Sequence, residues 1–402
     1  MPKRLEKNII VGLDIGTSKV TAIVAEVNQD GYLDIIGIGT ESSAGLKKGV
    51  VVNIDSAVQA VNKAVETAEY MSGCEIRSVT TSIAGSHIQG FNSHGIVAIR
   101  NEVVDGNDVD RVIDAAKAIL IPPDQKILHI LPQEFVIDKQ GGIQEPVGLS
   151  GVRLEANVHM ITGSIGVAQN IMTCLRNCDL ELEDIVLDQL ASSEAILSLE
   201  EKQQGVCVID IGGGTTDIAV FLEGAIYHTA VIPVAGDQVT NDIAVGLRTS
   251  LSQAETIKIQ HAVALKSLAD PEQKIDKNVS HLTLAEIVEP RFEELFALIQ
   301  AELNHHQLLE LLGAGIVITG GSAKMPGVIE LAAEIFQKPV RLGVPQDISG
   351  LIEVVHNPIY STAVGLLKYG YRAREQHQTE TTVIPSFKGI LGRIKQWFQG
   401  HF

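Results

Sequence analysis

The chain has 402 residues, enough for two or three domain-sized units, and its 45% hydrophobic and 20% charged content is that of a folded globular protein. A formal net charge of −18 and an aromatic content of only 4% argue against a general nucleic-acid binder, so no nucleic-acid partner is expected. Four cysteines without a CxxC pair indicate reduced thiols in a cytosolic protein. We expect no signal peptide and no membrane-spanning helix, because MPKRLEKNII runs straight into the first apolar segment and no apolar stretch is long enough.

The N-terminal part alternates apolar runs with turn residues. Three strands joined as hairpins are predicted, over residues 8–15, 19–29 and 32–41. A helix follows at 53–73, where Asn53 or Asp55 can cap the start and Gly73 ends the apolar periodicity. Another strand is predicted at 78–85.

Residues 86–162 differ in character from the segments on either side. One predicted helix at 109–119 lies among short strands, of which 127–138 and 152–162 are the clearest. This mixture indicates a small α+β insert. The strand–helix rhythm then returns with helices at 164–177 and about 188–199.

One motif occurs twice. VGLDIGTSKVTAIVAEV (11–27) and CVIDIGGGTTDIAV (207–220) each run an apolar strand into Asp-Ile-Gly, then small or hydroxyl residues, then a second apolar strand. Either alone is compatible with an ordinary hairpin turn. Two equivalent hairpins can face each other across a cleft and present backbone N–H groups to an anion. Their aspartates repel phosphate unless Mg²⁺ lies between the two, so the pair predicts a clamp for the phosphates of a Mg-nucleotide.

A third glycine element lies near the C-terminus. GIVITGGSAKMPGV (315–328) reads as a strand, a Gly320-Gly321 turn and a helix that starts near Pro326. Glycines there would let a purine or its ribose lie against the backbone. By itself this segment is typical of an ordinary strand–helix turn, but it becomes specific as the third member of an ordered set.

Further helices are predicted at 237–262, 283–311 and 357–370, followed by a polar linker over 371–385. His305-His306, at the polar end of the second of these helices, is more typical of solvated imidazoles than of a metal site.

The last segment, SFKGILGRIKQWFQGHF (386–402), has no acidic residue. A helix there would place its large apolar side chains on one face and its basic side chains off that face, a pattern that suits an anionic membrane surface. Docking on the protein's own core is the alternative, but the preceding polar linker and the terminal position favour a membrane or partner surface. The apolar residues are Phe387, Ile390, Leu391, Ile394, Trp397 and Phe398, and the basic residues are Lys388, Arg393 and Lys395.

Two phosphate hairpins, a purine-side Gly-Gly turn and two connecting helices, in this order, resemble the actin/Hsp70/sugar-kinase superfamily. The segments ILHILPQEFVID, EPVGLSGVRLE and NVHMITG, together with the basic tail, resemble the FtsA family of bacterial cell-division proteins over essentially the whole chain. The resemblance implies an α/β, actin-like fold in which duplicated ribonuclease H-like halves enclose a nucleotide cleft and the first half carries a small α+β insertion.

The resemblance also implies a division of the chain. Its parts are 1–83, the start of the first half; 84–162, an inserted domain for interaction and self-assembly; 163–204, the return to the first half with the first connecting helix; 205–356, the second half with the nucleotide and FtsZ-tail side; 357–370, the second connecting helix; 371–386, a flexible linker; and 387–402, a membrane-targeting helix.

Site residues follow from the resemblance position by position, with ATP and Mg²⁺ as ligands. The first phosphate element would be Asp14, Gly16, Thr17, Ser18 and Lys19, and the second Asp210, Gly212, Gly213, Gly214, Thr215 and Thr216; Asp14 and Asp210 would hold Mg²⁺ through water. Glu255, Lys258, Gly320, Gly321, Ser322 and Met325 would lie by the ribose and adenine.

Members of the family tether the FtsZ ring to the cytoplasmic side of the inner membrane, polymerise, and recruit later division proteins. The segment Glu289-Pro290-Arg291 matches their FtsZ-peptide region, which makes Arg291 and Glu294 contact candidates.

Asp188 is the nearest match to the Glu or Gln that orients water in related ATPases, or else a helix cap. Because its side chain is one methylene shorter than Glu, we expect tight ATP binding with slow or negligible turnover.

Three other readings remain. A small-molecule kinase needs a base facing a substrate pocket, and no such constellation is recognisable. A chaperone ATPase needs a substrate domain beyond residue 385, where only a short segment remains. An actin-like adaptor of a pilus machine would lack the terminal amphipathic segment.

Overall fold

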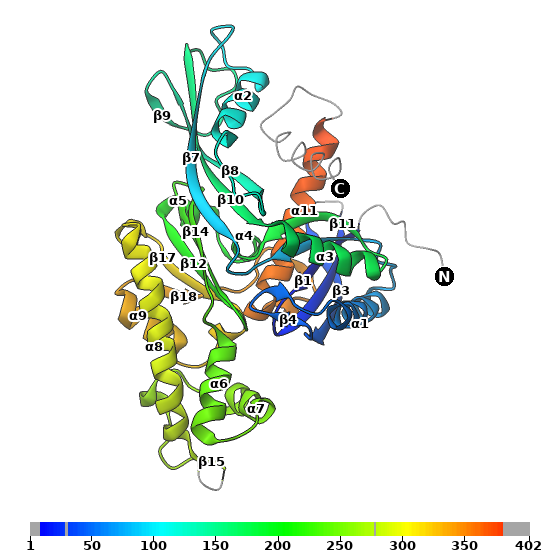
Figure 1. Ribbon diagram of the computed structural model, residues 1–402, viewed down its shortest axis with the longest axis vertical. Helices are drawn as coiled ribbons and strands as arrows, with labels where there is room; N and C mark the ends of the chain where they lie inside the picture. Colours follow the sequence, from blue (N-terminus) through cyan, green and yellow to red (C-terminus); the bar gives the residue numbers. More distant parts are fainter. Residues whose placement is uncertain (1–8, 29–30, 277–278, 381–402) are drawn as a thin grey trace.

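The computed structural model describes residues 9–28, 31–276 and 279–380. These residues form two sheet-based halves joined by helices, and a smaller third sheet projects from one end of the molecule (Figure 1). Nowhere in these ranges is a helix both long and apolar enough to cross a membrane.

The first half is built on a six-stranded sheet. In sheet order its strands are β11 (Glu181–Leu187), β6 (Ser78–Ile83), β1 (Ile9–Ile15), β2 (Lys19–Val27), β3 (Leu33–Ser42) and β19 (Ser349–Gly350). β1 pairs antiparallel with β2 and parallel with β6, and β2 pairs antiparallel with β3. α1 (Ile54–Ser72) covers this sheet; Asn53 caps it by accepting a hydrogen bond from the Ser56 N–H, and Gly73 ends it, as predicted.

The second half repeats this plan. Its five-stranded sheet has the order β14 (Ala225–Ile232), β13 (Thr216–Leu222), β12 (Val206–Ile211), β17 (Gly315–Thr319) and β18 (Val340–Leu342). β12 pairs antiparallel with β13 and parallel with β17, as β1 does with β2 and β6. The duplication that the sequence shows in two hairpins therefore extends to whole sheets.

The helices of the second half are α6 (Gly236–Leu247), α7 (Leu251–His261), α8 (His281–His305) and α9 (Val328–Phe336). Before α8 the short strand β15 (Lys274–Asp276) pairs antiparallel with β16 (Val279–Ser280). The single helix predicted over 237–262 is wrong. Arg248 adopts a left-handed conformation with φ of 51°, and Ser250 caps a second helix, so the chain turns between α6 and α7. α8 also ends earlier than the predicted residue 311.

The insert is a four-stranded antiparallel sheet with one helix, as the sequence predicts. Its strands are β7 (Gln89–Ala98), β10 (Arg153–Ser164), β8 (Gln125–Ile137) and β9 (Gln140–Ile143), and α2 (Gly106–Lys117) packs on the sheet. An apolar core of its own holds it together, with Phe135 and Met160 fully buried. In Figure 1 the insert stands at the opposite end of the molecule from α6 and α7.

Helices connect the parts. They are α3 (Ile165–Asn177), α4 (Asp188–Ile196), α5 (Leu199–Gln204), the short α10 (Ile352–Val355), and α11 (Ser361–Glu380), which follows a 3₁₀ turn at Pro358–Tyr360. A Cβ on Gly365 of α11 would lie 1.7 Å from the Ala191 carbonyl oxygen of α4. Only glycine allows the two helices to touch backbone to backbone here, at the junction of the two halves.

The linker predicted from residue 371 is wrong for its first part, because α11 continues to Glu380. Arg374 is anchored by an ion pair of 2.6 Å with Glu183 of the first half, and the arginine, alanine, glutamate and glutamine residues of this segment are strong helix formers. The remaining predicted linker and the membrane-targeting segment 387–402 lie outside the described residues.

Candidate functional site

The two glycine hairpins close in the same way. In the first turn the Gly16 N–H donates to the Lys19 carbonyl oxygen, and in the second the Gly212 N–H donates to the Thr215 carbonyl oxygen, both at 3.0 Å. Asp14 and Asp210 occupy the last position but one of β1 and β12, so each carboxylate stands just before its turn.

The glycines of the second turn are required because the two hairpins abut. A Cβ on Gly213 would lie 2.9 Å from the Ser18 Cβ, and one on Gly214 would lie 2.7 Å from the Thr17 Oγ1. Side chains at these positions would push the halves apart. The glycines therefore let the turns meet and leave their N–H groups available to a ligand.

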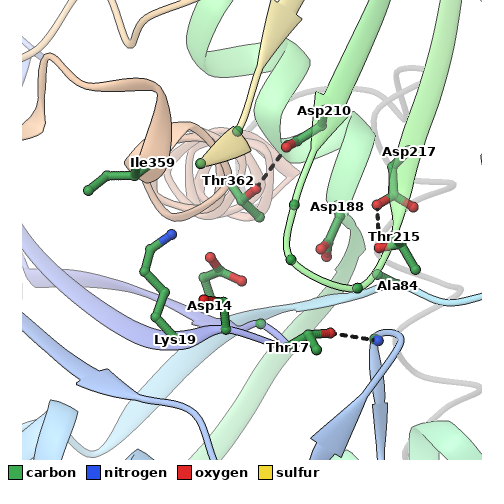
Figure 2. A pocket seen from close by; sticks show the side chains of 18 of the residues that line it. Asp14, Thr17, Lys19, Ala84, Asp188, Asp210, Thr215, Asp217, Ile359 and Thr362 are labelled. Atoms are coloured by element: carbon green, nitrogen blue, oxygen red, sulfur yellow. Dashed lines mark hydrogen bonds between the residues drawn. The ribbon is translucent and has the colours of Figure 1, made fainter. Parts of the chain in front are cut away.

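The residues around this junction line one pocket (Figure 2). They come from both hairpins, the small β4 (Leu46–Lys47)–β5 (Val50–Val51) turn, the end of β6, the start of α4, the turn after β17 and the start of α11. The lining residues are Asp14, Ile15, Gly16, Thr17, Ser18, Lys19, Gly49, Ala84, Asp188, Asp210, Gly212, Gly213, Gly214, Thr215, Asp217, Gly320, Gly321, Pro358, Ile359 and Thr362. Most residues predicted from sequence are thus brought together.

Four carboxylates converge in the pocket against a single basic side chain, Lys19, among the described lining residues. Burial raises the pKa of Asp14, and it raises the pKa of Asp210 to about 6. Burial and the Asp210 charge raise the pKa of Asp217 to about 7. The pKa of Asp188 is held well above its ordinary value by burial and by the other three carboxylates.

Hydroxyl groups satisfy only part of this acidic cluster. Ser82 donates to Asp14 at 3.3 Å. Thr362 donates to Asp210 at 3.3 Å and Thr215 to Asp217 at 2.8 Å (Figure 2). One oxygen of Asp188 and one of Asp217 are buried without a hydrogen-bond partner in the described part of the chain.

The pocket has more carboxylate oxygens than its lysine and hydroxyl groups can pair. Such a set of hard oxygen donors fits a divalent ion such as Mg²⁺, which keeps several waters. The donor set contains no sulfur or imidazole ligand, which a softer metal would favour.

Five predicted residues do not line the pocket. The Thr216 hydroxyl donates to the Val234 carbonyl at 2.7 Å, and the Ser322 hydroxyl donates to the Gly212 carbonyl at 3.0 Å, so each supports the backbone near the second hairpin. Met325 packs against the core of the second half.

The predicted ribose pair lies behind the second hairpin. Lys258 forms an ion pair with Glu255 at 2.7 Å and donates to the Gly236 carbonyl at 3.1 Å, at the start of α6. The Gly236 N–H in turn donates to Gly212. The pair is therefore next to the pocket without being part of its wall.

Asp217 and Thr362 are the polar side chains of the pocket lining that sequence reasoning missed. Asp217 pairs with Asp210 across the β12–β13 ladder, so its position on the far side of the glycines was the available signal. Thr362, at the start of α11, donates a hydrogen bond to Asp210, and no sequence pattern predicts that long-range contact.

The two predicted peptide-contact residues lie on α8 and are not part of the pocket lining. The Arg291 guanidinium forms a two-pronged contact with Asp242 of α6, at 2.5 and 3.0 Å, and also contacts Glu294. The hydrogen bond that Arg291 donates to Asp242 raises the pKa of Arg291 above its ordinary value. Arg291 is therefore engaged within the protein in this structure.

Two family models match the chain: "Cell division protein FtsA" over residues 207–365 and "SHS2 domain inserted in FTSA" over residues 85–162. A protein of Pseudomonas aeruginosa named "Cell division protein FtsA" is 54% identical over 409 aligned residues, which cover 98% of each chain. An Escherichia coli K12 protein of the same name is 41% identical over the full length of both.

Solved structures share the fold at low identity. The structure titled "PilM-PilN type IV pilus biogenesis complex" covers 90% of this chain and 98% of its own, with a TM-score of 0.67 and 15% identity. MreB5 of Spiroplasma citri bound to ADP covers 92% and 99%, with a TM-score of 0.51 and 16% identity. The predicted fold class, with its inserted domain, is confirmed.

The raised pKa values of the pocket carboxylates make the stability of the ligand-free protein depend on pH. A carboxyl group with a pKa of about 7 in the folded state, against 3.8 in the unfolded chain, stabilises the fold at low pH. That contribution is lost as the pH rises from about 4 to about 7. We expect Asp217→Asn to unfold like the parent protein at pH 4 and to be more stable by at least about 1 kcal/mol at pH 8.

Denaturant unfolding of ligand-free protein across this pH range measures the effect. Asp124→Asn, at an exposed aspartate, is the matched control and should follow the parent curve. A constant difference between Asp217→Asn and the parent at every pH would contradict the assignment.

Proposed function

Because the chain belongs to the FtsA family of cell-division proteins, we propose that it is an ATP-binding, actin-like adaptor that anchors the FtsZ ring to the cytoplasmic face of the inner membrane. Full-length identity of 54% to a named family member carries its role in cell division. The observation that carries nucleotide binding is the pair of abutting hairpins with Asp14 and Asp210 before their turns.

In the proposed complex the phosphates lie between the two hairpins. The N–H groups of Gly213 and Gly214 and the hydroxyls of Thr17 and Ser18 act as donors, and Lys19 adds a positive charge. Bound Mg²⁺ would neutralise charge shared by the phosphates and the carboxylates of Asp14 and Asp210. Gly320 and Gly321 leave room for the nucleoside.

Turnover is expected to be slow. Asp188, at the first position of α4, is the group available to orient a water molecule. Its short side chain sets the carboxylate back, and its raised pKa favours the protonated form, which accepts a proton poorly. We propose that ATP serves this protein mainly as an assembly switch.

The membrane anchor is proposed to be segment 387–402, on the sequence pattern described above. The chain reaches it through α11, whose first turn lies beside the pocket and contacts Asp210 through Thr362. The same helix therefore begins at the nucleotide site and leads toward the anchoring segment.

The partners proposed are the FtsZ C-terminal peptide near Arg291 and Glu294, a second copy of this chain in a polymer, and later division proteins at the insert. The likeness to PilM carries the fold alone at 15% identity, whereas the full-length identity to FtsA proteins favours cell division over a pilus machine. The same identity favours cell division over a small-molecule kinase.

Replacing Asp210 tests the clamp. We expect Asp210→Asn to weaken Mg-ATP binding at least about tenfold, because one of the two metal-facing charges is lost. In EDTA, Asp210→Asn should bind ATP as tightly as the parent protein or more tightly, because the Asp210 carboxylate of the parent then repels the phosphates. Isothermal titration calorimetry with Asp124→Asn as the control measures both; Mg-ATP affinity equal to that of the parent protein would exclude the clamp.

Deleting residues 387–402 tests the anchor. The 1–386 chain should bind Mg-ATP normally but remain in the supernatant with anionic phosphatidylglycerol vesicles, which the full chain should pellet. On neutral vesicles the three basic residues lose their attraction to anionic lipid, at roughly 1 kcal/mol for each charge. The full chain should therefore bind neutral vesicles about 100-fold more weakly. If the 1–386 chain pellets like the full chain, the anchor lies elsewhere.

Arg291→Gln tests the peptide contact and avoids placing a third carboxylate beside Asp242 and Glu294. We expect the affinity for the FtsZ C-terminal peptide, measured by fluorescence anisotropy, to fall about tenfold. The Arg291 and Asp242 side chains are 25% and 30% exposed, so loss of their ion pair should cost the fold about 1 kcal/mol and lower the melting temperature by only a few degrees. Arg176→Gln, on an exposed position of α3, is the control. Unchanged peptide affinity in Arg291→Gln would mean that the contact helix is misplaced.

A further inference from the structure

A second cluster of metal-binding side chains lies away from the nucleotide pocket. His228 comes from β14, and Glu302 and His306 lie one turn apart at the C-terminal end of α8. One ligand atom from each lies within 4.8 Å of the others. The two imidazole rings are stacked at a tilt, with centroids 4.2 Å apart.

We propose that His228, Glu302 and His306 form a zinc site that joins β14 to the end of α8. Two imidazoles and a carboxylate are a ligand set that proteins use for Zn²⁺ with a further position open to water. The Nε2 atoms of His228 and His306 lie 3.0 and 3.4 Å from the same Glu302 oxygen. Ligand atoms on one tetrahedral zinc ion are about 3.4 Å apart, given bonds of about 2.1 Å, so small side-chain adjustments suffice.

The surroundings of the cluster allow metal to enter. The side chain of His306 is 43% exposed and that of Glu302 is 33% exposed, so an ion can reach the ligands from solvent and retain water. His228, at 12% exposed, is largely buried. Burial, followed by the proximity of His306, lowers the pKa of His228 and favours the neutral imidazole that binds metal.

The neighbouring histidines are not further ligands. Both ring nitrogens of His159 are engaged, one with Asn92 at 2.7 Å and the other with Thr229 at 2.9 Å. His305 stacks edge-on against His306 but contributes no atom to the cluster. The sequence does not distinguish His305 from His306, whereas in the structure only His306 belongs to the cluster.

The position of the cluster gives the metal a structural consequence. The insert rests on β14 beside it: His159 contacts Thr229, and Gln133 donates to the Ile226 carbonyl at 3.1 Å. Metal bound at His228 would therefore fix the end of α8 to the strand on which the insert packs. Nitrogen ligands make the site selective for zinc-like ions over Mg²⁺, which distinguishes it from the nucleotide pocket.

Metal binding by the full chain tests the proposal. After removal of metal with a chelator, the untagged protein should bind one Zn²⁺ in equilibrium dialysis, and Co²⁺ should give the visible d–d band of a low-symmetry site. His306→Ala and Glu302→Gln should lose more than about 100-fold in zinc affinity, since the first removes a direct ligand and the second replaces an anionic oxygen ligand by a neutral amide. His305→Ala should bind as the parent does, and excess Mg²⁺ should not compete.

Thermal melting separates ligand loss from misfolding. Zinc should raise the melting temperature of the parent and of His305→Ala, and it should leave that of Glu302→Gln, the nearly isosteric variant, unchanged. Failure of the parent protein to bind zinc at micromolar concentration would overturn the proposal, and so would equal zinc affinity in parent, His306→Ala and Glu302→Gln.

Discussion

Repulsion among Asp14, Asp188, Asp210 and Asp217 is the constraint on which the cleft depends. The duplicated hairpins bring two of these carboxylates together, α4 adds the third and β13 the fourth. Lys19 and a few hydroxyl groups offset only part of this charge, and burial raises every carboxyl pKa. In the ligand-free cleft these four carboxyl groups are therefore partly protonated. A Mg-nucleotide would supply the missing cation together with the anion that the backbone N–H groups can bind.

The same constraint couples the cleft to the rest of the chain. Asp188 begins α4, and Thr362 in the first turn of α11 contacts Asp210. These two helices meet backbone to backbone at Gly365, so neither can shift at the junction without moving the other. A change of charge in the cleft thus acts directly on the helix that leads to the proposed anchor. This arrangement would give a bound nucleotide a structural role even where hydrolysis is slow.

Local patterns made much of this structure predictable. Strand alternation, an Asn53 cap and a terminal glycine predicted the first hairpins and α1, and the repeated Asp-Ile-Gly motif located the two glycine hairpins. Contacts between distant segments were not predictable. The left-handed Arg248 breaks a continuous helical pattern, and an ion pair to Glu183 extends α11 into a segment that is polar throughout. Likewise, strand pairing places Asp217 beside Asp210, and the packing of α8 on β14 places His306 beside His228.

Hydrogen–deuterium exchange on the full chain, with and without Mg-ATP, tests the clamp most directly. If the nucleotide is held between the hairpins, peptides covering residues 14–19 and 210–217 should both become protected on binding. Protection should be lost together in both when Mg²⁺ is withdrawn, because the aspartates then repel the phosphates. Protection of only one hairpin, or of neither, would contradict a site shared by the two halves.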